Sequence, residues 1–188
     1  MKNKLIIGLF IVLALVQIYV PFSMITKRED VLKHGVQFKF KTAPVDPFDA
    51  FRGRYVALKV EEDYVTKQGT QDFYAGCSVY AIIEVDSQGF AKFISLTTDR
   101  PIGKAYINAK TRYYYGAGDK IYLDLPFDRY YMEEKAAPAA EAAYRKHSQQ
   151  GEQDAYIVVR VKDGFAVIEG LYVAGQKIED LVKQENRR

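Results

Sequence analysis

The stretch DAYIVVRVKDGFAVIEGLYV, residues 154–173, decides the fold of this chain. Both of its halves are rich in β-branched and aliphatic residues, a composition that favours β-strands. The halves are separated by Lys162, Asp163 and Gly164. An Asp-Gly pair between two such runs is the strongest short-range signal for a β-hairpin. The stretch therefore predicts two antiparallel strands.

The preceding sequence repeats this pattern of short apolar runs and turns. SVYAIIEV and FAKFISLTT flank the turn DSQG and predict a hairpin over residues 78–98. A further pair of strands is expected from residues 105–115 and 120–125, joined by GAGD. VQFKFK at 36–41 and RYVALKVEED at 54–63 alternate apolar and polar side chains, as half-buried strands do. The sequence thus predicts a mainly antiparallel sheet.

Two segments depart from this pattern. The polar, glycine-containing residues 61–76 predict a mobile connection. Residues 133–149 are rich in alanine, with acidic residues first and basic residues near the end, which suits a helix and its dipole. Because proline is tolerated in the first turn of a helix, Pro138 places the regular part at residues 137–148. The predicted fold class of the domain is therefore mainly β (α+β), with this one helix.

An uninterrupted apolar run, LIIGLFIVLALVQIYVPFSMI, occupies residues 5–25. At 1.5 Å rise per residue, a helix of this length matches the roughly 30 Å hydrocarbon core of a bilayer. A cleaved signal peptide is the alternative, but its apolar region usually has about 7–15 residues and ends at a small-x-small site. Ser23 with Pro21 two residues before it makes a poor site of that kind. The run is therefore interpreted as a retained transmembrane helix that binds the lipid bilayer.

This interpretation divides the chain into four parts. They are a transmembrane anchor (1–26), a disordered or extended juxtamembrane linker (27–35), a β-rich domain (36–182) and a charged tail (183–188). Positive charges lie on both sides of the apolar run, so the charge count that sets orientation is nearly tied. Long domains are translocated largely regardless of charge. We therefore expect the domain on the outer side of the membrane.

Composition argues against several classes of function. The 27 basic and 24 acidic residues give a net charge of +3 and are scattered, which argues against binding to nucleic acid. A single cysteine, Cys77, cannot form an internal disulfide or a cysteine-rich metal site. A serine–lysine pair like that of type I signal peptidases would need Ser78 with Lys92 or Lys104, and nothing in the sequence supports such a pair. We expect no metal and no cofactor.

The densest group of polar side chains lies in residues 44–55, on a proline-containing loop that leads into a predicted strand. Its candidate binding residues are Asp46, Asp49, Arg52, Arg54 and Tyr55. In one interpretation, the carboxylates accept hydrogen bonds in a polar pocket and an arginine binds an anionic group bidentately. In the other, the carboxylates bond local backbone amides as Asx turns, and Arg52 holds the loop in place. The sequence leaves both interpretations open.

A second cluster, residues 128–134, precedes the predicted helix and contributes the candidates Arg129, Tyr131 and Glu133. Both clusters lie where predicted strands meet loops, so in one interpretation they line a common groove. In the simpler one, the second cluster is a strand end followed by the acidic start of a helix, which the helix dipole favours.

Residues 53–60, GRYVALKV, resemble the signature of the GDYXXLXY family, membrane-anchored bacterial proteins named for that string. Gly53, Tyr55 and Leu58 match the signature, whereas Arg54 and Val60 replace its aspartate and its final tyrosine. Further similarity lies in VDP at 45–47, FRG at 51–53, RYYMEE at 129–134 and GLYVAG at 170–175. The resemblance implies an anchor and a β-rich domain, and the family carries no assigned biochemical activity.

These observations favour a single-pass protein of the bacterial cytoplasmic membrane that acts as a non-enzymatic binding module in the cell envelope. Its expected partner is another membrane or envelope protein, bound through residues 44–55 and 128–134. The alternative is a membrane-anchored hydrolase. It would use Asp46 or Asp49 as general base, with Arg52 or Arg54 stabilising developing negative charge.

Overall fold

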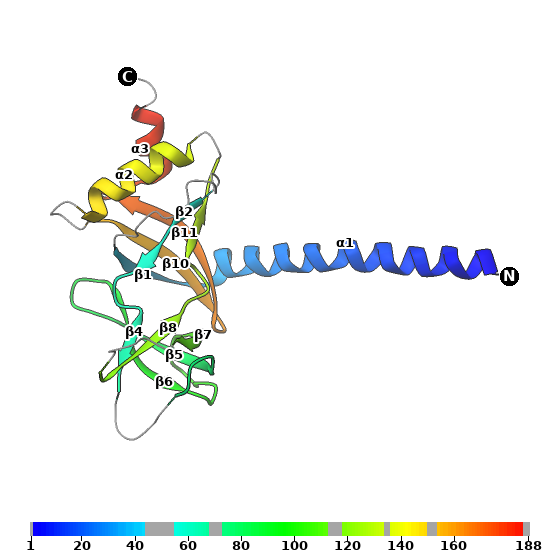
Figure 1. Cartoon of the computed structure of the whole chain (residues 1–188), viewed down its shortest axis with the longest axis horizontal. Helices are drawn as coiled ribbons and strands as arrows, with labels where there is room; N and C mark the ends of the chain where they lie inside the picture. Colours follow the sequence, from blue (N-terminus) through cyan, green and yellow to red (C-terminus); the bar gives the residue numbers. More distant parts are fainter. Residues whose placement is uncertain are drawn as a thin grey trace.

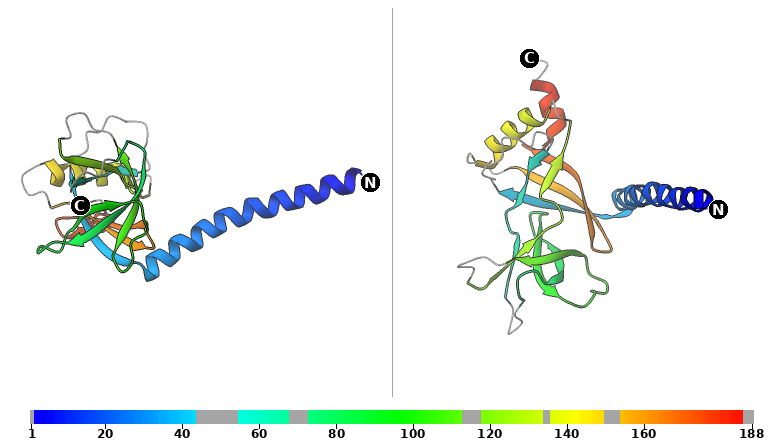
Figure 2. Two further views of the ribbon diagram at one scale, coloured as in Figure 1. Left: turned by 90° about the horizontal axis from the view of Figure 1, so that it is seen from below. Right: turned by 45° about the vertical axis from the view of Figure 1, so that its right-hand side comes forward.

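A long helix projects from a β-rich domain in the computed structural model of the chain (Figure 1). The structure describes residues 2–43, 55–67, 73–112, 118–133, 136–149 and 154–185. Helix α1 (Lys2–His34) is long and apolar enough to cross a membrane, a test that a signal sequence would also pass. Its large apolar side chains from Ile6 to Ile25 are exposed, and the helix extends away from the domain in every view (Figures 1 and 2). Ser23 and Thr26 donate their hydroxyls to carbonyl oxygens of the preceding turn, so these two groups are satisfied within the helix.

Five antiparallel strands form the first sheet, in the order β12-β11-β10-β1-β3. They are β1 (Val36–Ala43), β3 (Lys59–Val60), β10 (Tyr156–Lys162), β11 (Phe165–Val173) and β12 (Gln176–Lys177). The predicted β10–β11 hairpin is confirmed. Its turn residues Asp163 and Gly164 have φ values of 51° and 77°, the positive values that a type I′ turn requires.

Five more antiparallel strands form the second sheet, in the order β4-β8-β7-β5-β6. They are β4 (Tyr64–Thr66), β5 (Ser78–Val85), β6 (Ala91–Thr97), β7 (Tyr106–Arg112) and β8 (Lys120–Asp124). The predicted β5–β6 hairpin and β7–β8 pair are therefore both present. The edge strands β4 and β6 approach each other, so the sheet curls towards a barrel. The two sheets meet where the backbone N–H of Asn108 donates to the carbonyl of Gly164 over 2.9 Å.

A two-stranded ribbon and two helices complete the domain. In the ribbon, β2 (Tyr55–Ala57) pairs with β9 (Arg129–Tyr131). Helix α2 (Ala137–Gln149) confirms the predicted helix and packs against α3 (Ile178–Glu185), at the end of the domain that carries the C-terminus (Figure 1). Tyr144 of α2 is buried and donates its hydroxyl to the carbonyl of Ala43 over 3.0 Å, which holds α2 on β1.

The hydrophobic core joins these parts through Phe40 on β1, whose side chain is fully buried. Its ring stacks on Phe93 of β6, with centroids 5.4 Å apart. On another side it meets Phe127, just before β9, at 5.6 Å. One core therefore extends from the first sheet to the second sheet and to the ribbon, so the described parts of the domain stabilise one another.

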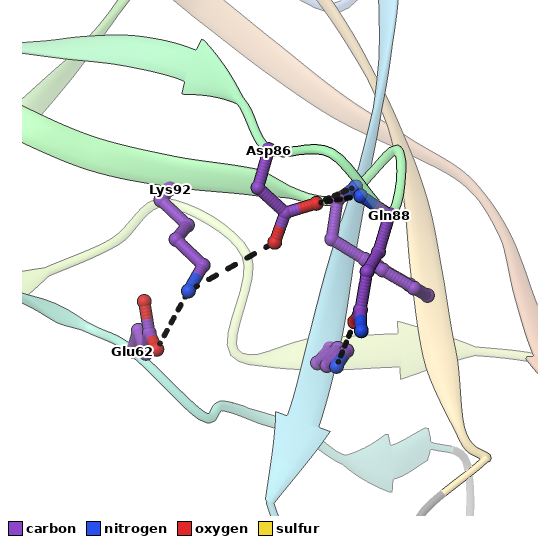
Figure 3. Close-up of polar contacts among 6 residues, drawn as sticks. Glu62, Asp86, Gln88 and Lys92 are labelled. Carbon is purple, nitrogen blue, oxygen red and sulfur yellow. Dashed lines mark hydrogen bonds and ion pairs between the residues drawn. The ribbon is translucent and has the colours of Figure 1, made fainter.

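A polar cluster also ties the β5–β6 hairpin to the first sheet (Figure 3). The carboxylate of Asp86 accepts the backbone N–H groups of Gln88 and Phe90, each over 2.9 Å. These backbone hydrogen bonds, that of Phe90 first, lower the pKa of Asp86. Lys41 on β1 donates to Gln88 over 3.0 Å. The hairpin turn is thereby fixed beside the end of β1 that lies away from α1.

The base of α1 is docked on the domain, which corrects the expectation of an extended or disordered segment after residue 26. Residues 27–34 are helical because the domain offers them partners. Val31 is only 2% exposed, and Asp30 accepts a hydrogen bond from Lys162 over 2.6 Å. Lys27 lies over the ring of Phe165, 4.4 Å from its centroid. The helix and the domain therefore meet through packed and paired side chains.

The turn from α1 into β1 depends on Gly35. Its N–H donates to the carbonyl of Val31 over 2.8 Å, and a Cβ at this position would lie 2.5 Å from that same oxygen. Arg160 on β10 donates to the Gly35 carbonyl and, over 2.6 Å, to Glu169 on β11. A side chain larger than hydrogen at residue 35 would thus disturb the point where helix and sheet join.

The expected mobile connection over residues 61–76 is wrong for its first part. It contains β4, whose Val65 is buried, and Asp63, which is 6% exposed. Asp63 accepts a hydrogen bond from Arg112 over 2.8 Å. Burial nevertheless raises the pKa of Asp63 above its ordinary value, because Arg112 does not fully offset the loss of hydration.

Two further segments differ from the sequence prediction. The strand expected over residues 54–63 is divided at Leu58, whose N–H donates to the carbonyl of Asp128, so β2 and β3 join different sheets. Helix α3 was not predicted and includes residues 183–185 of the expected tail. Its buried Ile178 and Val182 lie four residues apart, on one face of the helix.

Candidate functional site

The β2–β9 ribbon brings the two clusters of the sequence together at Tyr55 and Tyr131, which pair directly across the strands. Their rings lie 5.8 Å apart. Alternation along β9 directs Tyr130 into the core, at 8% exposed, and leaves Tyr131 65% exposed. The ribbon therefore presents a tyrosine pair at the surface of the domain.

Arg129 lies beside this pair. Its guanidinium carbon is 5.2 Å from the ring centroid of Tyr55, a cation–π geometry. The neighbouring Tyr131 hydroxyl and the Asp128 carboxylate, 3.5 Å from the guanidinium, raise the pKa of Arg129 above its ordinary value. The charged guanidinium thus lies against an aromatic face and beside a carboxylate, at the surface of the domain.

A groove of about 330 Å³ runs beside Arg129 and Tyr131 to the base of α1. Arg28 of the helix lines one part of it, and residues 166–168 of β11 line another. The groove therefore carries two guanidiniums, one from the helix and one from the ribbon, which suits an acidic or anionic group on a binding partner.

A second, larger hollow of about 560 Å³ shares Pro126 with this groove. It lies on the outer face of the second sheet, where Ser78, Lys110 and Asp124 stand opposite one another on β5, β7 and β8. All three side chains are exposed. The two hollows adjoin at Pro126, and only the smaller one includes a residue of α1.

Tyr130 makes the most buried polar contact of the ribbon. Its hydroxyl donates to the carboxylate of Glu179 at the start of α3, and burial raises the pKa of Tyr130 well above its ordinary value. The contact joins β9 to the last helix, so Tyr130 has a structural role, while Arg129 and Tyr131 are left facing solvent.

The candidate residues of the sequence are thus placed unequally. Tyr55, Arg129 and Tyr131 lie together. The side chain of Glu133 is exposed and its carbonyl accepts the N–H groups of Ala136 and Ala137 at the entry to α2. The remaining candidates lie outside the described residues: Asp46, Asp49, Arg52 and Arg54.

Sequence reasoning missed Arg28 as a groove residue. In the sequence, Arg28 is only one of the positive charges that flank the apolar run. It lines the same groove as Arg129 because α1 docks on β10 and β11. The basic cluster after residue 26 was the available signal, but nothing in it specifies a partner on the domain.

The strand register separates Ser78 from both lysines that the sequence offered as partners, Lys92 and Lys104. Lys92 stands opposite Glu84 at the other end of β5 from Ser78, and it donates to Glu62 over 3.2 Å. Lys104 precedes Ala105, whose carbonyl accepts the N–H of Ile83, again far along β5 from Ser78. Within the described ranges, no group of three or more His, Cys, Asp or Glu side chains is placed to hold a metal ion.

Comparison with known proteins identifies the family. The family model described as GDYXXLXY protein matches residues 17–171, which is most of the chain. The chain belongs to the GDYXXLXY family. No curated protein and no solved structure matches it.

The GDYXXLXY signature acquires a structural meaning from the strands it enters. Leu58 is 6% exposed and Val60 is 5% exposed, so these two signature positions pack in the core. Tyr55, in contrast, lies in the ribbon beside Arg129. Gly53 and Arg54 lie outside the described residues. Of the signature positions that the structure describes, only Tyr55 therefore belongs to the candidate site.

Proposed function

We propose that this chain is a membrane-anchored, non-enzymatic binding module of the bacterial cell envelope. In this proposal α1 is retained in the cytoplasmic membrane and the domain lies on its outer side. The module binds another membrane or envelope protein through the surface around the β2–β9 ribbon. The site residues that the structure describes are Arg28, Tyr55, Arg129 and Tyr131.

One observation carries the proposal: α1 and the ribbon line the same groove, through Arg28 and Arg129. Arg28 is only three residues beyond Ile25, the last residue of the apolar run. At 1.5 Å per residue, this is about 5 Å along the helix axis. A partner held in the same bilayer would therefore present its juxtamembrane segment at the depth of this groove.

The chemistry of the groove supports a protein partner. Tyrosine and arginine are enriched among the residues that dominate binding energy at interfaces. Tyr131 is 65% exposed, which leaves its ring available for contact, and Arg129 lies beside it against the ring of Tyr55. The expected partner surface is acidic and contains an apolar or aromatic side chain to cover Tyr131.

The hydrolase alternative has no comparable support, because the carboxylates it needs, Asp46 and Asp49, lie outside the described residues. The groove beside the ribbon contains one described carboxylate, Asp128, which is paired with Arg129 at 3.5 Å. We therefore favour binding over catalysis.

The test is site-specific photocrosslinking in cells that make the full chain. A benzophenone amino acid replaces Tyr131 in one variant and Ser87 in a control variant. Ser87 is exposed and lies next to Gln88, beside the end of β1 remote from α1. We expect a discrete crosslinked species from position 131 alone, and its loss when Arg129→Ala is added. Recovery of only the bait, or of the same species from both positions, would refute the proposal.

Two measurements test the anchor and its orientation. Intact mass of the membrane-extracted chain should include residues 5–25, whereas a cleaved signal peptide would remove them. A reporter fused after Arg188 should be active only on the outer side of the cytoplasmic membrane. Activity on the cytoplasmic side would reverse the proposed orientation.

A further inference from the structure

The loop that joins β6 to β7 carries Ile102, which is 96% exposed. No other large hydrophobic side chain in the described ranges is as exposed, including those of α1. Arg100 and Lys104 flank it two residues away on either side. Gly103 follows with φ 72°, a conformation that glycine adopts easily and that lets the loop turn sharply. An apolar tip between two cations suits the boundary between lipid headgroups and acyl chains.

The loop is fixed at the base of α1. Arg100 donates to the hydroxyl of Tyr106 and to the carboxylate of Asp163, each over 2.8 Å. Asp163 is in the β10–β11 turn, which lies on the side of the domain from which α1 projects (Figure 1). Arg100, Gly103 and Lys104 line one hollow with His34, the last residue of α1. Ile102 is therefore held close to the point where the helix enters the domain.

The depth of this region follows from the docking of α1. Phe165, at the start of β11, lies against Lys27. Lys27 is two residues beyond Ile25, so the contact is about 3 Å along the helix axis from the end of the apolar run. The contacts between α1 and the domain run from Lys27 to His34, about 3 to 14 Å beyond the end of the apolar run. With α1 spanning a bilayer, the β10–β11 turn and the Ile102 loop, joined by the Arg100–Asp163 pair, therefore face the headgroups.

The charges around the junction favour an anionic surface. The nearby acidic side chains are paired: Glu29 with Lys33, Asp30 with Lys162 and Asp163 with Arg100. Lys27, Arg28 and Lys104 form no ion pair within the part of the chain that the structure describes, and Asp99 is the remaining acidic residue of the loop. The junction thus keeps an excess of positive charge beside the membrane, and anionic lipids attract such residues.

We infer that residues 98–104 form a second membrane contact, in which Ile102 inserts at the headgroup boundary and Lys104 binds anionic phospholipid. The contact orients the domain on the bilayer in addition to the anchor. It rests on the retained anchor of the proposed function, but it does not require the protein partner.

The chain contains no tryptophan, so a single introduced tryptophan reports its own surroundings. The full chain is reconstituted in vesicles as three variants, Ile102→Trp, Ser87→Trp and Val16→Trp, the last within the apolar run. Lipids brominated close to the headgroup quench tryptophan fluorescence at that depth. We expect Ile102→Trp to be quenched at least about twofold more than Ser87→Trp, with blue-shifted emission, because only the former reaches lipid.

The possible outcomes distinguish a failure of the proposed loop contact from a failure of the proposed membrane anchor. Quenching of Val16→Trp by lipids brominated deep in the acyl chains, without quenching of Ile102→Trp, would overturn the loop contact and leave the anchor intact. Absence of quenching in both would overturn both. Binding of anionic phospholipid by Lys104 is tested by adding phosphatidylglycerol to phosphatidylcholine vesicles. Quenching of Ile102→Trp should increase, and adding Lys104→Glu should remove the increase; equal quenching in both lipids would refute the role of Lys104.

Discussion

Phe40 provides the most demanding test of the packing, because its ring is the contact between β1, the second sheet and the approach to the ribbon. The side chain is fully buried. Replacing a buried phenylalanine with alanine costs about 3–5 kcal/mol, from lost transfer free energy and the cavity that remains. Two aromatic neighbours place Phe40→Ala near the upper end of this range. Since domains are stable by only about 5–15 kcal/mol, the variant would lose much of its stability.

Phe40→Leu keeps most of the apolar volume and should fold, with a loss of about 1–2 kcal/mol. The free energy of unfolding is measured in detergent by urea titration, followed by the near-ultraviolet circular dichroism of the tyrosines. Val85→Ala is the control, because Val85 is 52% exposed and should change stability by less than about 0.5 kcal/mol. Equal stability of Phe40→Leu and the natural chain would refute the view of one shared core.

Three further predictions use the same titration. Val60→Tyr restores the signature tyrosine at a position only 5% exposed, and overpacking should cost about 1–3 kcal/mol; unchanged stability would reveal unused space. Gly164→Ala should cost more than Gly89→Ala, because both have positive φ but only a Cβ at Gly164 meets a neighbour, at 2.4 Å; equal losses would contradict this. The hydrogen bond from Arg160 lowers the pKa of Glu169 below 4.5, so its contribution to stability is present above that pH and lost as pH falls through the lowered value. Glu169→Gln should therefore weaken the acid dependence, and an identical pH profile would exclude this role.

The elements that sequence predicted correctly have local causes. The β10–β11 hairpin follows from Asp163 and Gly164, which adopt the positive φ values that this turn needs. Helix α2 follows from its alanine content and charge order. In contrast, β2 pairs with β9, and the second sheet lies between them in the chain, so no local pattern specifies that partner. Helix α3 was missed because a short charged segment conceals two buried residues, Ile178 and Val182.

The candidate site also combines features that the local sequence predicts with features that depend on tertiary contacts. The identity of Tyr55, Arg129 and Tyr131 as polar and aromatic candidates was readable from composition, but their contact depends on pairing between distant segments. The contribution of Arg28 depends on α1 docking through Val31 and Asp30, a tertiary contact that a charge count cannot predict. The sequence did not predict a role for the loop with Ile102, because single apolar residues between cations are common on protein surfaces.

The docked base of α1 has a mechanical consequence. Val31 and Asp30 hold the base of the helix on β10 and β11, so a change in the tilt of the helix is passed on to the domain. In the proposed anchoring, α1 changes its tilt when the thickness of the bilayer changes. The domain would turn with it, and the far end of the molecule would swing through the largest arc. The thickness of the bilayer would then determine the height and the angle at which the groove beside the β2–β9 ribbon is presented to a partner.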